Sequence, residues 1–261
     1  MKMKKISVVL LILFLNTFLF SATFRDKRRA MRAYRIAKKY IRRGNYVRAQ
    51  RFLVYAHKKY PEHEIIFARL VNVLKRNKDY KTLVRFYAAY TDKKTNNARI
   101  NSNMGTFAMK AKMWLKAIKY LQRAVKLKPD LYKAVYDLSL SYLRIKKYQQ
   151  CIKYSLLALK KNYNPVDVLR NLVKAHMQID LNDAAILYAK ELVKRTKSND
   201  AFALDSLAVL YAKIKDYKKA IATIELAIKV KKTALFTIRL EKYKKLLAQQ
   251  EAKNKKKKTG K

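Results

Sequence analysis

Glycine, proline and cysteine are scarce in this sequence, and the scarcity of each one excludes a class of protein. Only three glycines and three prolines occur among 261 residues. A phosphate-binding loop needs several glycines close together, so neither the GxxxxGK[ST] motif nor the GxGxxG motif can be written from this chain. Folds with many tight β-turns are disfavoured for the same reason. The single cysteine, Cys151, excludes an internal disulfide framework and a cysteine-based zinc cluster.

Acidic residues are scarce as well, whereas basic residues are abundant. The chain has 63 Lys and Arg but only 17 Asp and Glu, so its formal net charge is +46 at pH 7. Apolar residues make up 51% of the chain, which is enough for a sizeable core and excludes a fully disordered protein. A surface this basic attracts anionic partners: nucleic acid, anionic lipid, an acidic polymer or an acidic protein face.

The N-terminal segment, residues 1–22, predicts a signal peptide or an N-terminal membrane anchor. A basic stretch at Met1–Lys5 precedes an apolar run at Ile6–Phe20, and small residues follow. The run is shorter than the roughly 20 residues of a membrane-spanning helix. For cleavage after Ser21 or Ala22, however, a large residue stands where a small one is preferred, so an uncleaved anchor remains open. The arginines that follow oppose export, but the three-part pattern favours it. We therefore expect a periplasmic or cell-envelope location.

A 34-residue repeat runs through the body of the chain. The spacing of a ring, two alanines and a proline in Tyr46–Pro61 returns in Trp114–Pro129, and the offset of 68 residues is two periods of 34. With this phase, six repeats cover residues 30–63, 64–97, 98–131, 132–165, 166–200 and 201–234, with one inserted residue before the last.

Each repeat predicts a pair of helices. Apolar residues recur at repeat positions 4, 7, 8 and 11 and again at 17, 20, 24 and 27, which are two stripes at helical spacing. Small residues at positions 8, 20 and 27 allow the two helices to approach closely; Gly105 stands at such a position, and Gly44 stands in the turn between helices. Position 17 is occupied by Tyr46, Tyr80, Trp114, Tyr148, Asn182 and Tyr217. Neither helix buries its stripe alone, so each repeat needs its neighbours.

The phased small residues and rings resemble the tetratricopeptide repeat (TPR) family over residues 30–234. The resemblance implies an all-α fold, a right-handed superhelical solenoid of antiparallel helix pairs. Repeat two departs from the family pattern at Leu83 and Tyr90, and repeat five departs at Asn182 and Leu192. The packing at these four positions is therefore open, whereas the phase of the repeats is not.

The C-terminal residues predict one more helix and a tail. Phe236, Leu240, Tyr243 and Leu247 form a single apolar stripe, so residues 235–251 are expected to form a helix that caps the last repeat. Residues 252–261 are a basic, low-complexity segment, which we expect to be a disordered tail.

The resemblance also implies that the first helix of each repeat lines a concave, partner-binding groove. Its candidate residues are Tyr34, Arg35, Lys38, Arg42, Arg69, Asn72, Arg76, Arg99, Asn103, Lys110, Lys133, Tyr136, Arg144, Arg170 and Lys174. Arginine binds carboxylates through two parallel hydrogen bonds, so an acidic peptide or helix is the expected ligand. The alternative is that these residues are ordinary solvated charges.

A carboxylate clamp, which some TPR domains use to hold the end of a peptide, is only partly present. Asn72, Asn103 and Lys133 stand at three of its five positions, but Ala68 and Asp137 stand where cations belong. The sequence therefore does not predict this kind of ligand site.

No group of residues indicates catalysis, a metal site or a cofactor. Cys151 falls at a small packing position and is expected to be a buried, inert thiol. His176 stands at a packing position too, and His57 and His63 lack a carboxylate pair at metal-ligand spacing. We therefore expect a protein that is not an enzyme.

The charge is distributed unevenly along the chain. Residues 23–63 contain 14 Lys and Arg and two Asp and Glu, whereas residues 166–200 contain six and five. We expect an acidic protein partner for the first four repeats. The hypothesis is an interaction scaffold or assembly factor on the periplasmic side of a bacterial cell envelope, in a machine such as the periplasmic flagellar motor or outer-membrane assembly. Two alternatives remain: binding of nucleic acid or another anionic polymer, and contact of residues 25–43 and the tail with anionic lipid.

Overall fold

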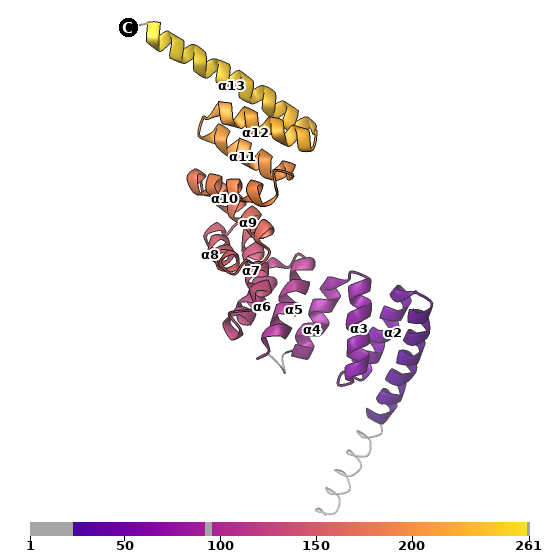
Figure 1. The fold of residues 1–261 in the computed structure, drawn as a ribbon. Coiled ribbons are helices and arrows are strands. Elements are labelled where there is room, and N and C mark those ends of the chain that lie inside the picture. Colours follow the sequence, from indigo (N-terminus) through magenta and orange to yellow (C-terminus); the bar gives the residue numbers. More distant parts are fainter. Residues whose placement is uncertain (1–22, 92–95, 260–261) are drawn as a thin grey trace, which may run out of the picture. The chain divides into compact units, whose positions relative to one another are not determined.

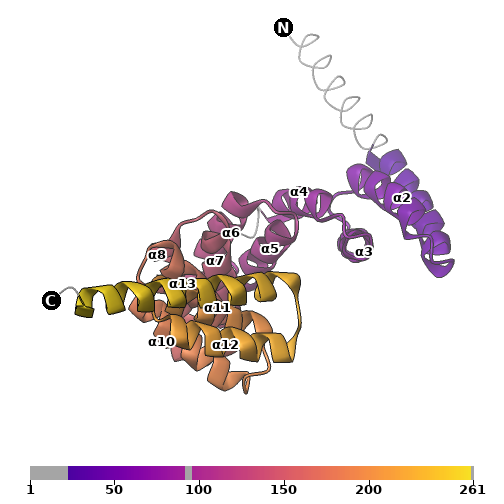
Figure 2. The same cartoon turned by 90° about the horizontal axis from the view of Figure 1, so that it is seen from above.

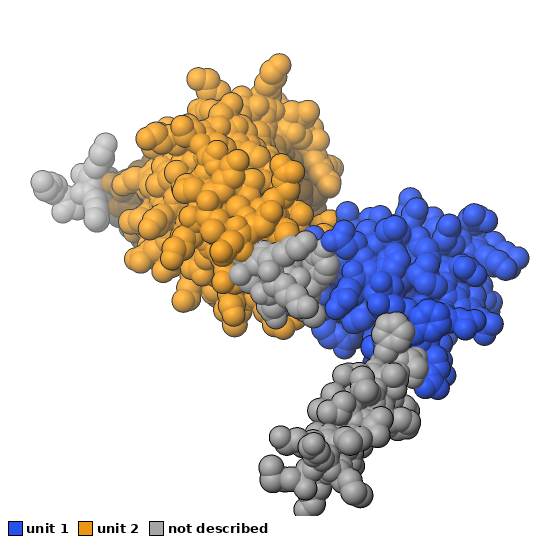
Figure 3. Space-filling model, turned by 90° about the horizontal axis from the view of Figure 1, so that it is seen from below, with its two compact units in different colours: residues 1–90 blue, residues 91–261 orange. Residues whose placement is uncertain are grey.

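The computed structural model describes residues 23–91 and 96–259, and helices are the regular elements throughout that part of the chain (Figure 1). The expected all-α solenoid of helix pairs is thereby confirmed. The chain divides into two compact units, residues 1–90 and residues 91–261, which we call unit 1 and unit 2 (Figure 3). The predicted signal peptide or anchor, residues 1–22, lies outside the described residues. No helix among the described residues is long and apolar enough to cross a membrane.

The described residues of unit 1 form two helix pairs. Residues 23–42 form its first helix, which begins earlier than the expected residue 30, and α2 spans Tyr46–Lys59. The second pair consists of α3, Glu64–Arg76, and α4, Tyr80–Thr91.

Unit 2 contains four helix pairs and a final helix, and each helix from α5 to α13 packs against the next one in the chain (Figure 2). The helices are α5 Ala98–Lys110, α6 Trp114–Leu127, α7 Tyr132–Arg144, α8 Tyr148–Lys160, α9 Pro165–Gln178, α10 Asn182–Arg195, α11 Ala201–Lys213, α12 Tyr217–Val230 and α13 Ala234–Thr259. The first helices of successive repeats also touch, because α5 contacts α7, α7 contacts α9, and α9 contacts α11.

The helix starts follow the phase of the repeat. Each second helix, from α2 to α12, begins at repeat position 17, so the residue at that position opens the helix. The first helices α3, α5, α7 and α11 begin at position 1, and α9 begins one residue before it, at Pro165. Proline suits the first turn of a helix because its missing N–H would have no partner there.

The turn inside every repeat requires a left-handed residue at position 15. Gly44 has φ +71°, and the same conformation is adopted by Lys78, Lys112, Lys146, Asp180 and Lys215, with φ between 56° and 62°. In repeat three, for example, the Met113 N–H donates to the Ala108 carbonyl at 2.8 Å, and the Lys112 N–H donates to the Met109 carbonyl at 2.9 Å. These two bonds form a Schellman motif, for which glycine is the favoured residue. Only repeat one has that glycine.

Small residues hold the two helices of a repeat close together, as expected. A Cβ atom on Gly105 of α5 would lie 2.3 Å from Leu121 Cγ of α6, well inside van der Waals contact. The larger residues of the two divergent repeats are accommodated, because Leu83 and Leu192 are buried in the core. Asn182 is accommodated less well, because its side-chain oxygen is buried without a hydrogen-bond partner.

The C-terminus differs from the expectation. The capping helix is present, with Phe236 and Tyr243 buried in the cluster that includes residues of α11 and α12, but α13 continues to Thr259 and extends past the end of α12 (Figure 1). The prediction of a disordered tail is therefore wrong for residues 252–259. Alanine, lysine and glutamine are good helix formers, and no glycine occurs between Ala234 and Thr259. Cations near a helix C-terminus are also stabilised by the helix dipole.

Candidate partner-binding surface

The expected groove cations of unit 2 include two that are bound to carboxylates of the same unit. The Lys133 ammonium donates to Asp137 Oδ2 at 2.6 Å and to Thr106 Oγ1 at 2.8 Å. Thr106 Oγ1 in turn donates to the same Asp137 oxygen at 2.8 Å. Asp137 is buried, so Lys133 neutralises a carboxylate that would otherwise be costly to bury.

Arg170 is engaged in the same way. Its guanidinium donates to Asp167 Oδ1 and to Asp200 Oδ2, both at 2.6 Å. Asp200 also caps α11, because its other oxygen accepts the N–H groups of Phe202 and Ala203. Burial acts to raise the pKa of Asp200, but the bonds from Arg170 and from the two backbone N–H groups outweigh it and lower that pKa. The bond to Asp200 is also the main cause of the raised pKa of Arg170.

Tyr136 is half-buried between these two networks. Burial is the main cause that raises the pKa of Tyr136 to about 12, and the charges of Asp167 and Asp137 add to it. The phenol therefore stays protonated at physiological pH. A further link joins α13 to α11, where the Arg239 guanidinium donates to the Asp205 carboxylate. Polar bonds thus link α5 to α7, α9 to the start of α11, and α11 to α13, and they use cations and carboxylates of the unit itself.

A second kind of link, which the sequence reasoning missed, joins position 13 of one repeat to position 17 of the repeat before it. The Arg76 guanidinium lies 5.0 Å from the centre of the Tyr46 ring, and the Arg144 guanidinium lies 5.8 Å from that of Trp114. In repeats four and five the pair is a hydrogen bond from the Tyr148 hydroxyl to the Gln178 amide oxygen, at 3.3 Å. Each pair is 30 residues apart. The recurrence of rings at position 17 was visible, but their partners lie in the next repeat.

Unit 1 brings three of the expected groove residues together. Arg69, Asn72 and Arg76 project from α3 at helical spacing and line a hollow of about 460 Å³, together with Lys75, Val73, Ile41 and Tyr46. Since cation–π stacking occupies the face of the Arg76 guanidinium, its N–H groups remain able to bind a carboxylate in the plane of the group. The hollow therefore combines hydrogen-bond donors and positive charge with apolar side chains.

A hydrogen-bond network fixes the wall of this hollow, which we call the α3 hollow. Asn77, just after α3, donates to the Tyr46 carbonyl at 3.1 Å and to Gln50 Oε1 at 2.6 Å. Gln50 donates in turn to Asp79 Oδ2 at 2.8 Å. The start of α2 and the end of α3 are thereby held together, so the Tyr46 ring and Arg76 keep their places.

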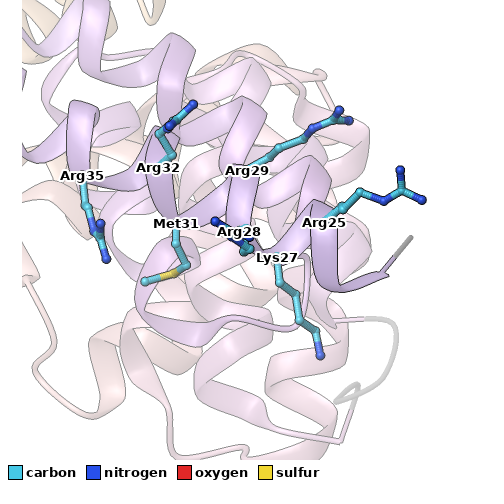
Figure 4. A pocket seen from close by; sticks show the side chains of 7 residues that line it. All are labelled: Arg25, Lys27, Arg28, Arg29, Met31, Arg32 and Arg35. Atoms are coloured by element: carbon cyan, nitrogen blue, oxygen red, sulfur yellow. The ribbon is translucent and has the colours of Figure 1, made fainter. Parts of the chain in front are cut away.

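The first helix of unit 1 carries a dense set of cations. Arg25, Lys27, Arg28, Arg29, Arg32 and Arg35 project from it in several directions around a second hollow (Figure 4). Residues 23–90 contain 20 Lys and Arg but only four Asp and Glu, so most of these cations have no carboxylate of unit 1 with which to pair. Residues 91–261 contain 40 Lys and Arg and 13 Asp and Glu, so cations are in excess in unit 2 as well, but by a smaller ratio.

The other expected groove residues have varied surroundings. Tyr34 is buried, with 9% of its surface exposed, and its ring lies 6.5 Å from that of His63, so it supports the first helix pair from inside. The remaining candidates are exposed at the surface: Arg35, Lys38, Arg42, Arg99, Asn103, Lys110, Arg144 and Lys174.

The cysteine and two of the histidines are packing residues. Burial raises the pKa of the Cys151 thiol to about 11, and Cys151 Sγ contacts the Ser155 hydroxyl at 3.9 Å. Burial lowers the pKa of His57, whose ring packs against those of Phe67 and Phe86. His176 Nδ1 lies 2.8 Å from the Leu172 carbonyl. Among the described residues, no three His, Cys, Asp or Glu side chains are placed to hold a metal ion.

A family model for the tetratricopeptide repeat matches residues 203–233, which is the sixth helix pair. Its length and phase are those of the five pairs before it. The chain has the fold of a tetratricopeptide repeat array. No curated protein sequence matches it.

Solved TPR structures share this fold over most of the chain. A tetratricopeptide repeat protein from Parabacteroides merdae has 19% identity and a TM-score of 0.60, covering 86% of this chain and 88% of its own. YrrB, described as a TPR protein with an unusual peptide-binding site, has 16% identity and a TM-score of 0.61, covering 73% and 97%. PilW, described as a type IV pilus biogenesis factor, has 16% identity and a TM-score of 0.56, covering 82% and 97%.

At the carboxylate-clamp positions of this TPR array, two side chains bind each other. Lys133, the one cation among them, is bound to Asp137, which itself stands at a clamp position. Asp137 thus stands where the clamp would have a cation, and it neutralises Lys133, the clamp cation that is present.

Proposed function

We propose that this TPR protein is a non-enzymatic interaction scaffold that binds acidic protein segments through the α3 hollow of unit 1. The observation that carries the proposal is the convergence of Arg69, Asn72 and Arg76 on one hollow, in a unit whose residues 23–90 include 20 basic and four acidic residues. The cations of this unit greatly outnumber its own carboxylates, so a partner's carboxylates can supply the missing charge.

The residues that line the α3 hollow also indicate the chemistry of its ligand. Arg69 and Arg76 suit carboxylates, and Asn72 can donate to or accept from a peptide backbone. Ile41, Tyr46 and Val73 offer apolar surface beside them. The expected ligand is therefore a peptide segment that combines acidic residues with an apolar side chain. YrrB, a neighbour in fold, is described as having a peptide-binding site, which is consistent with this use of a TPR surface.

We further propose that the protein acts on the periplasmic side of a bacterial cell envelope, as an assembly factor in a machine such as the periplasmic flagellar motor or outer-membrane assembly. The signal-like pattern of residues 1–22 supports this location, and PilW, which shares the fold, is described as a pilus biogenesis factor. Compartment fractionation with protease treatment of intact and permeabilised cells tests it. Protection until the outer membrane is opened is expected; a purely cytosolic protein would refute the location.

The binding proposal is tested with two labelled peptides of one length. Both have leucines at every third or fourth position, and the other positions are Glu in one peptide and Lys in the other. Fluorescence anisotropy with the full chain should show binding of the Glu peptide, and R69E/R76E should weaken it at least about tenfold. The matched control is R99E/K174E, which makes the same charge change at two exposed groove candidates of unit 2 and is expected to have little effect.

Two results would contradict this proposal. Equal losses in R69E/R76E and R99E/K174E would show that net charge, and not the α3 hollow, binds the peptide. Tighter binding of a single-stranded oligonucleotide than of the Glu peptide, with a steep dependence on salt, would favour an anionic-polymer function instead. Thermal melts of both double variants separate a loss of binding from a loss of folding.

A further inference from the structure

The first repeat has an apolar face whose counterparts are covered in the later repeats. At repeat position 7, Leu70, Met104, Leu138 and Leu172 are fully buried and Leu207 is 6% exposed. Leu172, for example, belongs to a cluster that includes Ala158 of the preceding helix pair. Ile36 stands at this position in repeat one and is only partly buried, because no repeat precedes it among the described residues.

Around Ile36 lies a groove between the two helices of the first pair. Ala33 and Ile36 of the first helix and Phe52 and Tyr55 of α2 line a hollow of about 450 Å³. Tyr55 is 44% exposed. Phe52 is held from the inner side by Tyr40, whose ring stacks on it at 5.5 Å. The result is a preformed apolar floor at the end of unit 1, which we call the end groove.

Arginines form the rim of the end groove. Arg29 and Arg32 of the first helix and Arg51 of α2 line the same hollow, and Figure 4 shows Arg29 and Arg32 projecting on the same side of their helix. Arg29 also lies 3.9 Å from the partly exposed Asp26 carboxylate, which is a weak surface pair. Arg32 and Arg51 are both exposed. The groove is thus apolar at its centre and positive at its edges.

We infer that the end groove docks an amphipathic helix of a partner protein, with an apolar stripe bordered by Asp and Glu. A helix fits because α7, α9 and α11 each pack against the second helix of the preceding repeat, so this side of a first helix is shaped to receive one. Acidic borders fit because their carboxylates would meet Arg32 and Arg51 across the rim.

A second copy of this chain fits the end groove poorly. Stacking one array on the end of another would bring α13 to the groove, and the exposed residues of α13 include Lys242, Lys244 and Lys245. Two end grooves placed face to face would oppose arginine to arginine. Like charges across an interface disfavour both arrangements, so the partner is a different, acidic protein.

The test uses the full chain carrying R69E/R76E, which removes the α3 hollow, so that its outcome does not depend on the function proposed above. The probes are the Glu and Lys peptides already described. The Glu peptide should bind, and the Lys peptide should bind at least about tenfold more weakly. Adding I36S/Y55S should reduce binding of the Glu peptide at least about tenfold, whereas V47S, which changes an exposed residue of α2 outside the groove, should not.

Charge reversal distinguishes docking from a loss of structure. R32E/R51E should invert the preference, so that the Lys peptide binds more tightly than the Glu peptide, whereas K58E at an exposed site of α2 outside the groove should leave the preference unchanged. A loss of folding cannot produce an inverted preference. Equal binding of both peptides before any groove substitution, or equal losses in V47S and I36S/Y55S, would overturn the inference. A dimer in sedimentation that I36S/Y55S dissociates would overturn it in favour of a second copy.

Discussion

Unit 1 and unit 2 are built from the same kind of helix pair, but the cations at their groove positions have different surroundings. In unit 2, Lys133 and Arg170 donate to Asp137, Asp167 and Asp200 at 2.6 Å, and the bond from Arg170 to Asp200 joins neighbouring helix pairs. In unit 1, Arg69 and Arg76 line an accessible hollow, and residues 23–90 contain 20 basic and four acidic residues. Two arginines at groove positions can therefore have different roles, one structural and one available to a partner. A carboxylate of the same unit within hydrogen-bond distance, as for Arg170, decides between them.

Two residues of the chain, Trp114 and Cys151, can report the unfolding of unit 2 separately from that of unit 1. Trp114 is the only tryptophan and Cys151 the only cysteine, and both belong to unit 2. Tryptophan fluorescence and thiol labelling therefore follow unit 2 alone, whereas circular dichroism follows all the helices. Because Cys151 is buried and burial raises its thiol pKa, labelling should require unit 2 to open.

The largest expected effect comes from closing the space between α5 and α6. In G105V, the added side chain would collide with Leu121, and overpacking of this kind costs about 3 kcal/mol. The Trp114 transition in urea should move to lower concentration, and Cys151 should become labelled faster. The matched control is A212V, at a partly buried position of α11 in the same unit. A Trp114 midpoint in G105V equal to that of the wild type would contradict the close approach.

An intermediate effect is expected when Arg170 loses one of its two carboxylate partners. D200A removes both the ion pair and the cap of α11, so unit 2 should lose about 1–2 kcal/mol of unfolding free energy. Arg170 would keep only its bond to Asp167, so D200A should add binding of the Glu peptide to a chain that carries both R69E/R76E and R32E/R51E, in which the two binding surfaces of unit 1 are reversed. A matched control is D183A, which removes an exposed carboxylate of α10.

The same pair has a defined pH dependence. The pKa of Asp200 is lowered in the folded chain, so its contribution is complete above the unfolded value of about 4 and is lost as the pH falls through the lowered folded value. The stability difference between the wild type and D200A should be constant near neutral pH and shrink in acid. A difference that grew in acid would contradict the assignment.

The smallest expected effect concerns the left-handed residue of each turn. K112G and K146G should each stabilise unit 2 by up to about 1 kcal/mol, because glycine adopts positive φ without the steric cost that lysine bears. In unit 1, G44K should destabilise the first pair by a similar amount. The control K116G places glycine inside α6 and should destabilise. If K112G destabilised as K116G does, the turn geometry would be refuted.

The helices themselves follow from local sequence. Each second helix begins at position 17, where aromatic rings recur in the sequence. Gly105, a small residue at a packing position, predicted the close approach of α5 to α6. The end of α13 could not be predicted from the sequence, because Ala252–Lys261 contains charge repeats typical of disorder and also strong helix formers. Two local tendencies competed there, and composition alone favoured the wrong one.

The sequence by itself determined the period, the helix pairs and the excess of positive charge, because each of these depends on residues within one 34-residue repeat. Only the tertiary structure decided which cations are available. Arg170 meets Asp200 across 30 residues, and Arg76 stacks on Tyr46 across the same distance in the chain. A charge carries the same sign in a sequence wherever it stands. Whether it is neutralised depends on the neighbours that stacking of the repeats brings within a few ångströms.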